Sequence, residues 1–185
     1  MTIDSAPPID TARLTLRGHK AGDIDESAAL WADPIVVRHI GGRPFTREES
    51  WTRLLRYAGH WALLGFGYWV VRERSTGRFV GEVGLADYRR DLVPSIEGTP
   101  EAGWVLAPWA HGQGLAGEAV AAALAWIDDV HRAPRTVCII DPDNAASLRV
   151  AARAGYRERE RTTYKGGPTI LLERRAPRDA VEECG

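Results

Sequence analysis

The strongest constraint on the fold is a strand–helix–strand pattern between residues 102 and 140. Residues 102–106 have the composition of a strand, and residues 136–140 are apolar and β-branched, as in a strand buried on both faces. Between them, apolar side chains recur every three or four positions, which predicts a helix over residues 115–131. A helix that joins two strands of one sheet favours a parallel arrangement, so we expect a parallel pair here.

The segments on either side complete a mixed α/β pattern. The other strands are expected at residues 13–17, 68–73, 79–85, 156–164 and 169–172, and the other helices at residues 23–31, 47–63 and 144–154. Thr46 and Glu49 form a capping-box pair before one of these helices. We therefore predict one α/β domain over residues 13–175, with flexible tails at residues 1–12 and 176–185.

Composition places this domain among ordinary globular proteins. The 185 residues carry 24 basic and 25 acidic side chains, for a net charge of −1, and 44% of them are hydrophobic. A near-neutral chain lacks the basic field of general nucleic-acid or anionic-membrane binders, so we expect neither as a partner. The longest apolar run, residues 119–127, is too short to span a bilayer.

The cysteines and the N-terminus indicate a reducing compartment. Cys138 and Cys184 are the two cysteines, so a disulfide framework is not expected. The first ten residues lack the basic and apolar regions of a signal peptide, and we expect a cytoplasmic protein. No metal site is expected, because His39, His60 and His131 belong to no cluster with ligand-like spacing.

The segment most informative about chemistry is residues 101–117, EAGWVLAPWAHGQGLAG. A strand ends, a short loop with Gly112 and Gly114 follows, and a long helix begins near Leu115. Glycines let a ligand approach the backbone closely, and the first amides of a helix lack internal partners. With the helix dipole they form an anion site suited to phosphate. A glycine loop that only turns the chain has the same pattern, so the loop alone does not decide its role.

Two familiar phosphate-binding motifs fit this loop poorly. A P-loop requires Lys followed by Ser or Thr after its last glycine, where this chain has Leu115 and Ala116. Residues 112–117 have the GxGxxG spacing of a dinucleotide fingerprint, but the chain before them is not the first half of a Rossmann fold. The next strand ends at Asp141, a spacing compatible with a dinucleotide, so a dinucleotide-binding enzyme stays an open alternative.

A second polar cluster follows the next strand, at Asp141, Asp143, Asn144 and Ser147. Asn144 and Ser147 are three residues apart at the start of a helix, so both fit on one face of its first turn. An N-cap role for Asp143 or Asn144 explains the same pattern without any ligand.

The two clusters together resemble the Gcn5-related N-acetyltransferase superfamily, in particular its ribosomal-protein N-terminal acetyltransferase branch. The acetyl-CoA loop of that family stands here as residues 111–116, HGQGLA, and the later Asn-x-x-Ser and Gly-aromatic pairs stand as Asn144, Ser147, Gly155 and Tyr156. The resemblance covers about residues 13–175. It implies a mixed, mostly antiparallel sheet with a central splayed parallel strand pair, flanked by helices.

The resemblance also implies an activity, the transfer of an acetyl group from acetyl-CoA to a primary amine by direct attack in a ternary complex. Acetyl-CoA is then a co-substrate, and no metal takes part. The residues implied to bind it are Val105, Leu106, His111, Gly112, Gln113, Gly114, Leu115, Ala116, Gly117, Asn144 and Ser147. The implied acceptor is a small amine or a protein N-terminus, and a homodimer is compatible with this family.

Three residues are candidates for the chemical step. Glu101, at the start of its strand, is the first candidate for a general base that takes a proton from the amine, and Glu82 is the second. Ser147 is the candidate that protonates the leaving thiolate. Asp91 and Glu97, which share a loop with Glu101, support the hypothesis of a cationic acceptor.

The sequence departs from the family pattern at three positions. His111 stands where the family has Arg or Gln, and Gly117 stands where the branch often has Thr. Ala151 stands where many members carry a Tyr that protonates the thiolate. These departures leave a second interpretation open, a module that binds CoA or acyl-CoA without catalysis.

Overall fold

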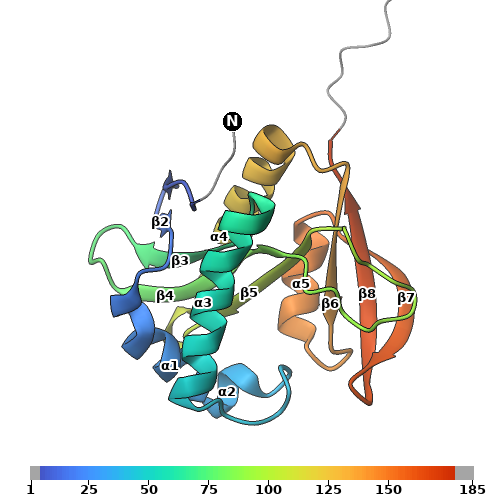
Figure 1. Ribbon diagram of the computed structural model, residues 1–185, viewed down its shortest axis with the longest axis horizontal. Helices are drawn as coiled ribbons and strands as arrows, with labels where there is room; N and C mark the ends of the chain where they lie inside the picture. The colour runs from blue at the N-terminus through green and yellow to red at the C-terminus, as the bar shows by residue number, and fades with distance from the viewer. Residues whose placement is uncertain (1–4, 178–185) are drawn as a thin grey trace, which may run out of the picture.

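The computed structural model describes residues 5–177, which form one eight-stranded sheet with helices on both faces (Figure 1). The strands are β1 (Ile9–Asp10), β2 (Leu14–Arg17), β3 (Tyr68–Glu73), β4 (Phe79–Ala86), β5 (Glu101–Leu106), β6 (Arg135–Ile140), β7 (Arg157–Tyr164) and β8 (Gly167–Arg175). The helices are α1 (Ile24–Ala32), α2 (Pro34–Val37), α3 (Arg47–Leu64), α4 (Leu115–Trp126) and α5 (Ala145–Arg153).

The sheet has the order β1-β2-β3-β4-β5-β6-β8-β7 and is antiparallel throughout except between β5 and β6. These two strands are parallel, as the helical crossover between them predicted. Within the described chain they share one registered pair, Glu101 with Val137. The two strands therefore diverge beyond that pair, which confirms the splayed arrangement that the family resemblance implied.

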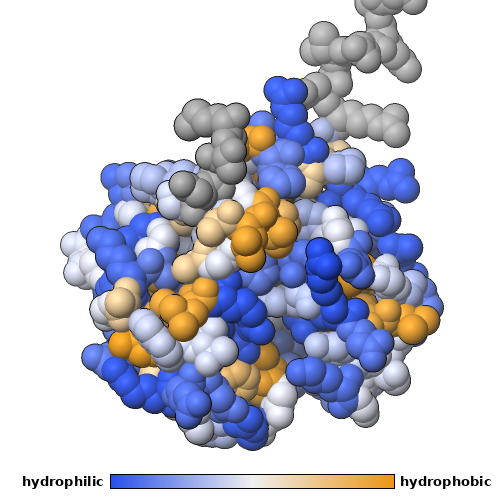
Figure 2. All heavy atoms as spheres, viewed as in Figure 1, coloured by the Kyte–Doolittle hydropathy of each residue, from blue (hydrophilic) through white to orange (hydrophobic). Residues whose placement is uncertain are grey.

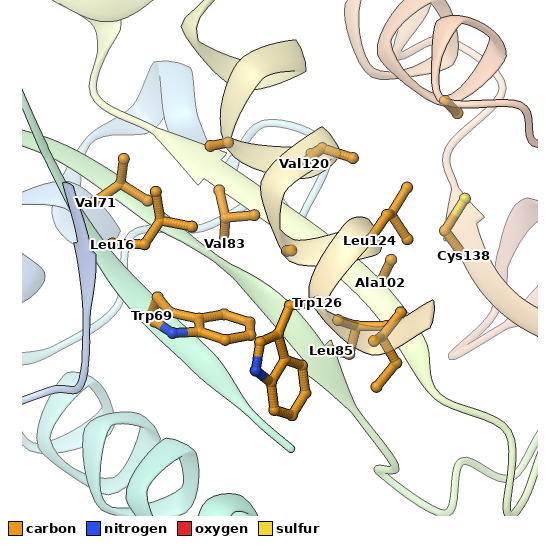
Figure 3. Packing of buried hydrophobic residues seen from close by; sticks show 14 of the residues in the cluster. Leu16, Trp69, Val71, Val83, Leu85, Ala102, Val120, Leu124, Trp126 and Cys138 are labelled. Atoms are coloured by element: carbon orange, nitrogen blue, oxygen red, sulfur yellow. The ribbon is translucent and has the colours of Figure 1, made fainter. Parts of the chain in front are cut away.

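The side-chain alternation of β3 shows how the two faces of the sheet are covered. Trp69 and Val71 belong to the larger core, together with Leu124 and Trp126 of α4 (Figure 3). The Trp69 and Trp126 rings meet edge to face, with centroids 5.4 Å apart. Val70, which lies between Trp69 and Val71 in the sequence, points to the opposite face of the sheet. It packs there in a smaller cluster with α1 and α2.

A long loop covers the other half of the sheet on the α1 and α2 face. Leu92 and Ile96 of this loop pack against Val137 of β6 and Leu171 of β8. In Figure 1 the loop crosses in front of β6 and β8, beside α3. Helix α3 and this loop therefore flank the place where β5 and β6 separate.

Helix α3 is anchored to the sheet by stacked tyrosines. The rings of Tyr57 in α3 and Tyr68 in β3 are 4.3 Å apart and nearly parallel. Two glycines make room for Tyr68: a Cβ on Gly84 would lie 2.3 Å from the Tyr68 Cα, and one on Gly103 would lie 2.0 Å from its hydroxyl oxygen. Both positions thus require glycine because of a close approach.

Three details differ from the sequence-based expectations. Ile9–Asp10, expected in the N-terminal tail, form β1, which pairs with β2 in the antiparallel direction. The short helix α2 was not expected, and the helix predicted to reach His131 is α-helical only to Trp126, with a wider π turn at Ile127–His131. The remaining parts of both predicted tails, with Cys184, lie outside the described residues. No helix in residues 5–177 is long and apolar enough to cross a membrane.

Candidate functional site

The glycine loop and the start of α4 form the first part of the site. Gly112 and Gly114 have φ angles of +74° and +77°, a left-handed conformation that residues with a Cβ rarely adopt. Gly114 is the N-cap residue of α4, and no side chain of the described residues caps the helix there. The first amides of α4 are therefore free to bind an anion, which the helix dipole also favours.

Arg13, the residue directly before β2, brings a positive charge to this loop. Its Nη1 donates to the carbonyl oxygen of Gln113 at 2.9 Å, and its Nε donates to Glu118 Oε2 at 2.7 Å. A Cβ placed on Gly114 would lie 3.6 Å from Arg13 Nη2. The guanidinium thus lies directly beside the uncapped start of α4.

His111 contacts the end of β5 through one of its two ring nitrogens. Its Nε2 lies 2.9 Å from the carbonyl oxygen of Leu106, so this nitrogen is engaged with the backbone at the end of β5. His111 stands where the family has Arg or Gln. In this fold Arg13, from a distant part of the chain, places a cation beside the same loop.

Beside the loop, the second half of β5 has one free edge. Val105 pairs with Glu82 and Leu106 with Gly81 on the β4 side. On the other side, the diverging β6 offers no registered partner to these residues within the described chain. Backbone groups of β5 are therefore available to an extended ligand that lies between the two strands.

This opening leads into a cavity of about 770 Å³, which we call the central cavity. Its wall comes from α3 and the segment before it, the start of the loop after β4, β5, and the end of β6 with the first turn of α5. Of the predicted site residues, the wall contains Glu101, Val105, Asn144 and Ser147. Figure 2 shows that hydrophilic side chains dominate the molecular face on which α3 lies, with apolar side chains in separate patches.

Glu101 lies in the wall as one half of a buried ion pair. Only 5% of the residue is exposed, and both carboxylate oxygens accept hydrogen bonds from Arg90, at 2.6 and 2.8 Å. Arg90 Nη1 also donates to the Tyr164 hydroxyl at 2.9 Å. Burial lowers the pKa of Arg90, but its bonds with Glu101 and Tyr164 outweigh this effect and raise that pKa above its usual value.

Glu82, the second candidate base, is fully buried and is not part of the cavity wall. Ser27 Oγ and Trp31 Nε1 donate to its two oxygens at 2.7 and 2.9 Å, and His19 Nε2 lies 3.5 Å away. Burial raises the pKa of Glu82, but His19, Ser27 and Trp31 together bring it below the ordinary value. A carboxylate held in this way ties α1 to β4, and it lies outside the cavity wall in which an amine would meet a base.

Asn144 and Ser147 occupy the first turn of α5. The Asn144 side-chain oxygen accepts a hydrogen bond from the Ser147 amide at 3.0 Å, so Asn144 is the N-cap of α5. Ser147 Oγ makes no hydrogen bond within residues 5–177, although the residue lines the cavity. Ala151, where a family tyrosine is missing, is fully buried and offers no hydroxyl to the site.

A histidine–carboxylate pair in the same wall was not predicted from the sequence. His39 Nδ1, before α3, lies 3.3 Å from Asp141 Oδ2, at the end of β6, and both side chains are partly exposed. The two residues are 102 positions apart, so no local spacing signals the pair. A carboxylate that orients an imidazole in this way is a common arrangement for a general base.

Comparison with known proteins places the chain in a family. A family model for the acetyltransferase (GNAT) domain matches residues 13–157. The chain belongs to the GNAT acetyltransferase family. A solved GNAT-family acetyltransferase from Bordetella pertussis is 32% identical, with a TM-score of 0.81, and the match covers 91% of this chain and 99% of that one.

Two other proteins resemble this GNAT protein, one in sequence and one in fold. YkkB of Bacillus subtilis, an uncharacterized protein, is 27% identical over 151 residues, which are 80% of this chain and 83% of the relative. A spermidine N-acetyltransferase from Vibrio cholerae, solved with CoA and spermine, is 16% identical with a TM-score of 0.70, over 90% of this chain and 97% of that one. The second likeness concerns the fold alone.

The GNAT fold also shows which acidic residues surround the central cavity. Asp91 and Glu97, expected to favour a cationic acceptor, are exposed and are not part of its wall. The third residue of that hypothesis, Glu101, is neutralised by Arg90. Of the three residues of that hypothesis, the described cavity wall therefore contains Glu101 alone. No group of three His, Cys, Asp or Glu side chains among the described residues is arranged to hold a metal ion.

Proposed function

We propose that this GNAT protein transfers the acetyl group of acetyl-CoA to a primary amine, by direct attack of the amine on the thioester in a ternary complex. The observation that carries the proposal is the free edge of β5: the loop after this strand leads to the uncapped start of α4, and Val105 of the strand lies in the wall of the central cavity. A long thioester with a diphosphate at one end and a reactive carbon at the other matches this sequence of surfaces.

The residues present fit such a co-substrate. The amides of residues 112–116 and the guanidinium of Arg13 would hold the diphosphate, because both supply donors and positive charge. Val105 and Leu106 would offer backbone groups to the pantetheine arm. The Vibrio cholerae enzyme of the same fold was solved with CoA, which supports CoA as the class of co-substrate.

The proposed reaction needs no further reactant. The amine nitrogen forms a bond to the thioester carbonyl carbon, the carbon–sulfur bond breaks, and the electron pair of that bond stays on sulfur. Glu101 would take the proton that the amine loses, directly or through a water, and later release it to solvent. Ser147 Oγ would give a proton to the sulfur and regain one from water. Much of the acceleration would come from holding the two reactants in contact.

His39 is the alternative base, on the observation that Asp141 orients its ring at the cavity wall. The two candidates are distinguished by paired variants, Glu101→Gln and His39→Gln, assayed with the same amine. The variant that removes the base should lose about 100-fold in kcat, whereas the other should retain most of its turnover.

The first test is binding, by calorimetry and thermal shift with acetyl-CoA, CoA, NAD and ATP compared directly. A ligand present at about 100 times its dissociation constant adds about 2.7 kcal/mol of stability. Gly114→Glu should abolish the response to acetyl-CoA and CoA, because a carboxylate would face the diphosphate. Gly77→Glu is a matched control, since Gly77 has a φ of +72° and open surroundings in the β3–β4 turn.

The second test is turnover, measured as release of free CoA thiol in the presence of primary amines and short peptides. Amine-dependent release supports the proposal and separates small amines from protein N-termini as acceptors. Tight acetyl-CoA binding without any amine-dependent release would instead support a CoA-binding module. A response to NAD alone would support the dinucleotide-binding alternative.

A further inference from the structure

The central cavity carries positive charge that the acidic side chains of its wall do not neutralise. The wall contains Asp87, Glu101 and Asp141, and twice as many Arg and Lys side chains. Two of these cations are accounted for, since Arg90 pairs with Glu101 and Arg89 lies 3.5 Å from an exposed Glu97 oxygen. Arg53 and Arg56 of α3 form no ion pair with any residue in the described part of the chain.

The remaining acidic groups of the wall are already engaged by other partners. Asp87 accepts hydrogen bonds from the backbone amides of Arg89 and Gly98, both at 3.0 Å. Asp141 accepts a hydrogen bond from the Asp143 amide at 2.8 Å and faces His39 with its other oxygen. None of these carboxylates is positioned as a counter-ion for α3.

Aromatic rings, and not a carboxylate, hold the Arg53 side chain in position. Its guanidinium carbon lies 3.8 Å from the centroid of Trp31 and 4.9 Å from that of Phe45. One hydrogen bond, from Nη1 to the Tyr57 hydroxyl, is long at 3.4 Å. The Nε atom is buried and has no hydrogen-bond partner in residues 5–177. The Glu82 carboxylate accepts a hydrogen bond from Nε1 at the edge of the same Trp31 ring, and it forms no ion pair with Arg53 in the described part of the chain.

Arg56 stands one helical turn further along α3, on the same side as Arg53. Its guanidinium carbon lies 4.7 Å from the centroid of Tyr88, and that of Arg90 lies 4.6 Å from the same centroid. One aromatic ring therefore links the unpaired Arg56 to the Arg90–Glu101 pair. The guanidinium carbons of Arg56 and Arg90 are therefore no more than 9.3 Å apart.

We infer that the acceptor amine also carries an anionic group, a carboxylate or a phosphate, which Arg53 and Arg56 bind while the amine faces Glu101. The inference rests on the proposed acetyl transfer and names the chemical class of its acceptor. The partly buried Arg53 guanidinium without a counter-ion is costly, and an anion that forms charge-assisted hydrogen bonds with it and with the exposed Arg56 removes that cost. A polycation such as a polyamine meets repulsion at the same place.

The test compares amines that differ in the anionic group. 4-Aminobutanoate is paired with butylamine, and O-phosphoethanolamine with ethylamine; spermidine is the cationic reference. We expect the anionic member of at least one pair to have a kcat/KM at least about tenfold higher, as one charge-assisted contact provides. The pair that shows the larger ratio identifies carboxylate or phosphate as the recognised group.

Variants locate the effect. Arg56→Gln should raise the KM for the preferred anionic acceptor about tenfold and leave the acetyl-CoA dissociation constant unchanged, and Arg56→Glu should reverse the preference toward spermidine. Arg56 is the primary position because its side chain is exposed, whereas Arg53 packs on Trp31. Arg153→Gln on α5, an exposed arginine outside the cavity wall, is the matched control and should change neither value.

The outcomes separate the two proposals. Turnover of butylamine, ethylamine or spermidine equal to or better than that of the anionic amines overturns the inference and leaves acetyl transfer intact. If no amine is acetylated, the proposed function fails, and calorimetry of 4-aminobutanoate and O-phosphoethanolamine with the protein–CoA complex decides the inference. Binding that Arg56→Gln removes supports anion recognition, and no binding by either probe overturns it.

Discussion

The carboxylate of Glu101 meets the guanidinium of Arg90 through two hydrogen bonds, at 2.6 and 2.8 Å, where β5 and β6 begin to diverge. Arg90 belongs to the loop that covers β6 and β8, so the pair ties this loop to the central strand of the sheet. The same contact orients the candidate base and compensates its buried charge. Its chemical and structural contributions are separable by substituting each partner in turn.

Glu101→Gln should reduce kcat about 100-fold, because an amide of the same shape cannot accept the amine proton. The acetyl-CoA dissociation constant should not change, since the diphosphate site lies at the start of α4. Steady-state kinetics and calorimetry measure the two quantities. Glu97→Gln, an exposed position of the same loop, is the control. Full activity of Glu101→Gln would assign the base to His39 or to solvent.

Arg90→Gln should destabilise the protein by about 3–5 kcal/mol, because it leaves the Glu101 carboxylate buried without its counter-ion. Urea unfolding measures this loss. The double variant Arg90→Gln with Glu101→Gln should lose less than the sum of the single variants, since the unpaired charge is then gone. Additive losses would show that the two side chains do not act as a pair.

Arg13→Gln should weaken acetyl-CoA binding about tenfold, because it removes the cation beside the uncapped start of α4. Calorimetry at two salt concentrations measures this effect, and the variant should show the smaller salt dependence. Arg74→Gln is a suitable comparison, since Arg74 donates to the nearby Thr11 carbonyl oxygen without touching the glycine loop. Equal affinities of both variants and the parent chain would exclude Arg13 from the site.

Asp23 provides a test of stability against pH. Burial raises the pKa of Asp23, but hydrogen bonds from Arg17 at 2.6 and 2.8 Å and from the Lys20 amide outweigh it and lower the pKa to about 2 from an ordinary 3.8. A shift of this size contributes about 2 kcal/mol of stability at neutral pH. Because the folded-state pKa is the lower one, this contribution is present above the ordinary value and is lost as the pH falls toward 2.

Asp23→Asn should therefore lower the free energy of unfolding by about 2 kcal/mol at neutral pH, and the difference from the parent chain should shrink on acidification below the ordinary pKa. Chemical denaturation across the acid range checks both statements. Asp25→Asn is the control, since the Asp25 side chain is 78% exposed. A difference that stayed constant with pH would contradict the role assigned to the ionised carboxylate.

Gly84→Ala should destabilise the protein by about 3 kcal/mol, because the added Cβ would lie 2.3 Å from the Tyr68 Cα and 2.4 Å from the Gly67 carbonyl oxygen. Both neighbours are backbone atoms, which cannot move aside as a flexible side chain can. Gly22→Ala, with nothing within 4 Å of its Cβ, should change stability by about 0.5 kcal/mol or less. Thermal unfolding of the two variants under the same conditions gives the comparison.

The amino-acid pattern was sufficient to predict most of the elements. Predicted and observed bounds of β3 agree, and those of α3 differ by one residue, because apolar periodicity and the capping box of Thr46 and Glu49 are local signals. The strand β1 was not predicted, because two residues carry no periodicity and their strand conformation is defined by pairing with β2. The last turn of the crossover helix likewise adopts a π conformation that no local spacing indicated.

In the candidate site too, local sequence patterns indicated some residues, whereas packing decided the environment of the others. The glycine loop was predicted because glycines directly before a helix form a local sequence pattern. Asn144 and Ser147 were singled out because their spacing of three residues at a helix start is also a local pattern. Glu101 and Glu82 were ranked without knowledge of their partners. Glu101 lies in the cavity wall, whereas Glu82 lies outside it and is bound by Ser27 and Trp31; both placements are properties of packing.

The sequence by itself determined the α/β class, the parallel crossover and the glycine loop at the start of α4, since each depends on neighbouring residues and on the periods of helix and strand. Only the tertiary structure decided which charges meet. It placed Arg13 beside Gly114, His39 beside Asp141, and the unpaired Arg56 one tyrosine ring away from Arg90. Ion pairing and burial depend on distances between residues far apart in the chain, and those distances exist only once the sheet and its covering helices have packed.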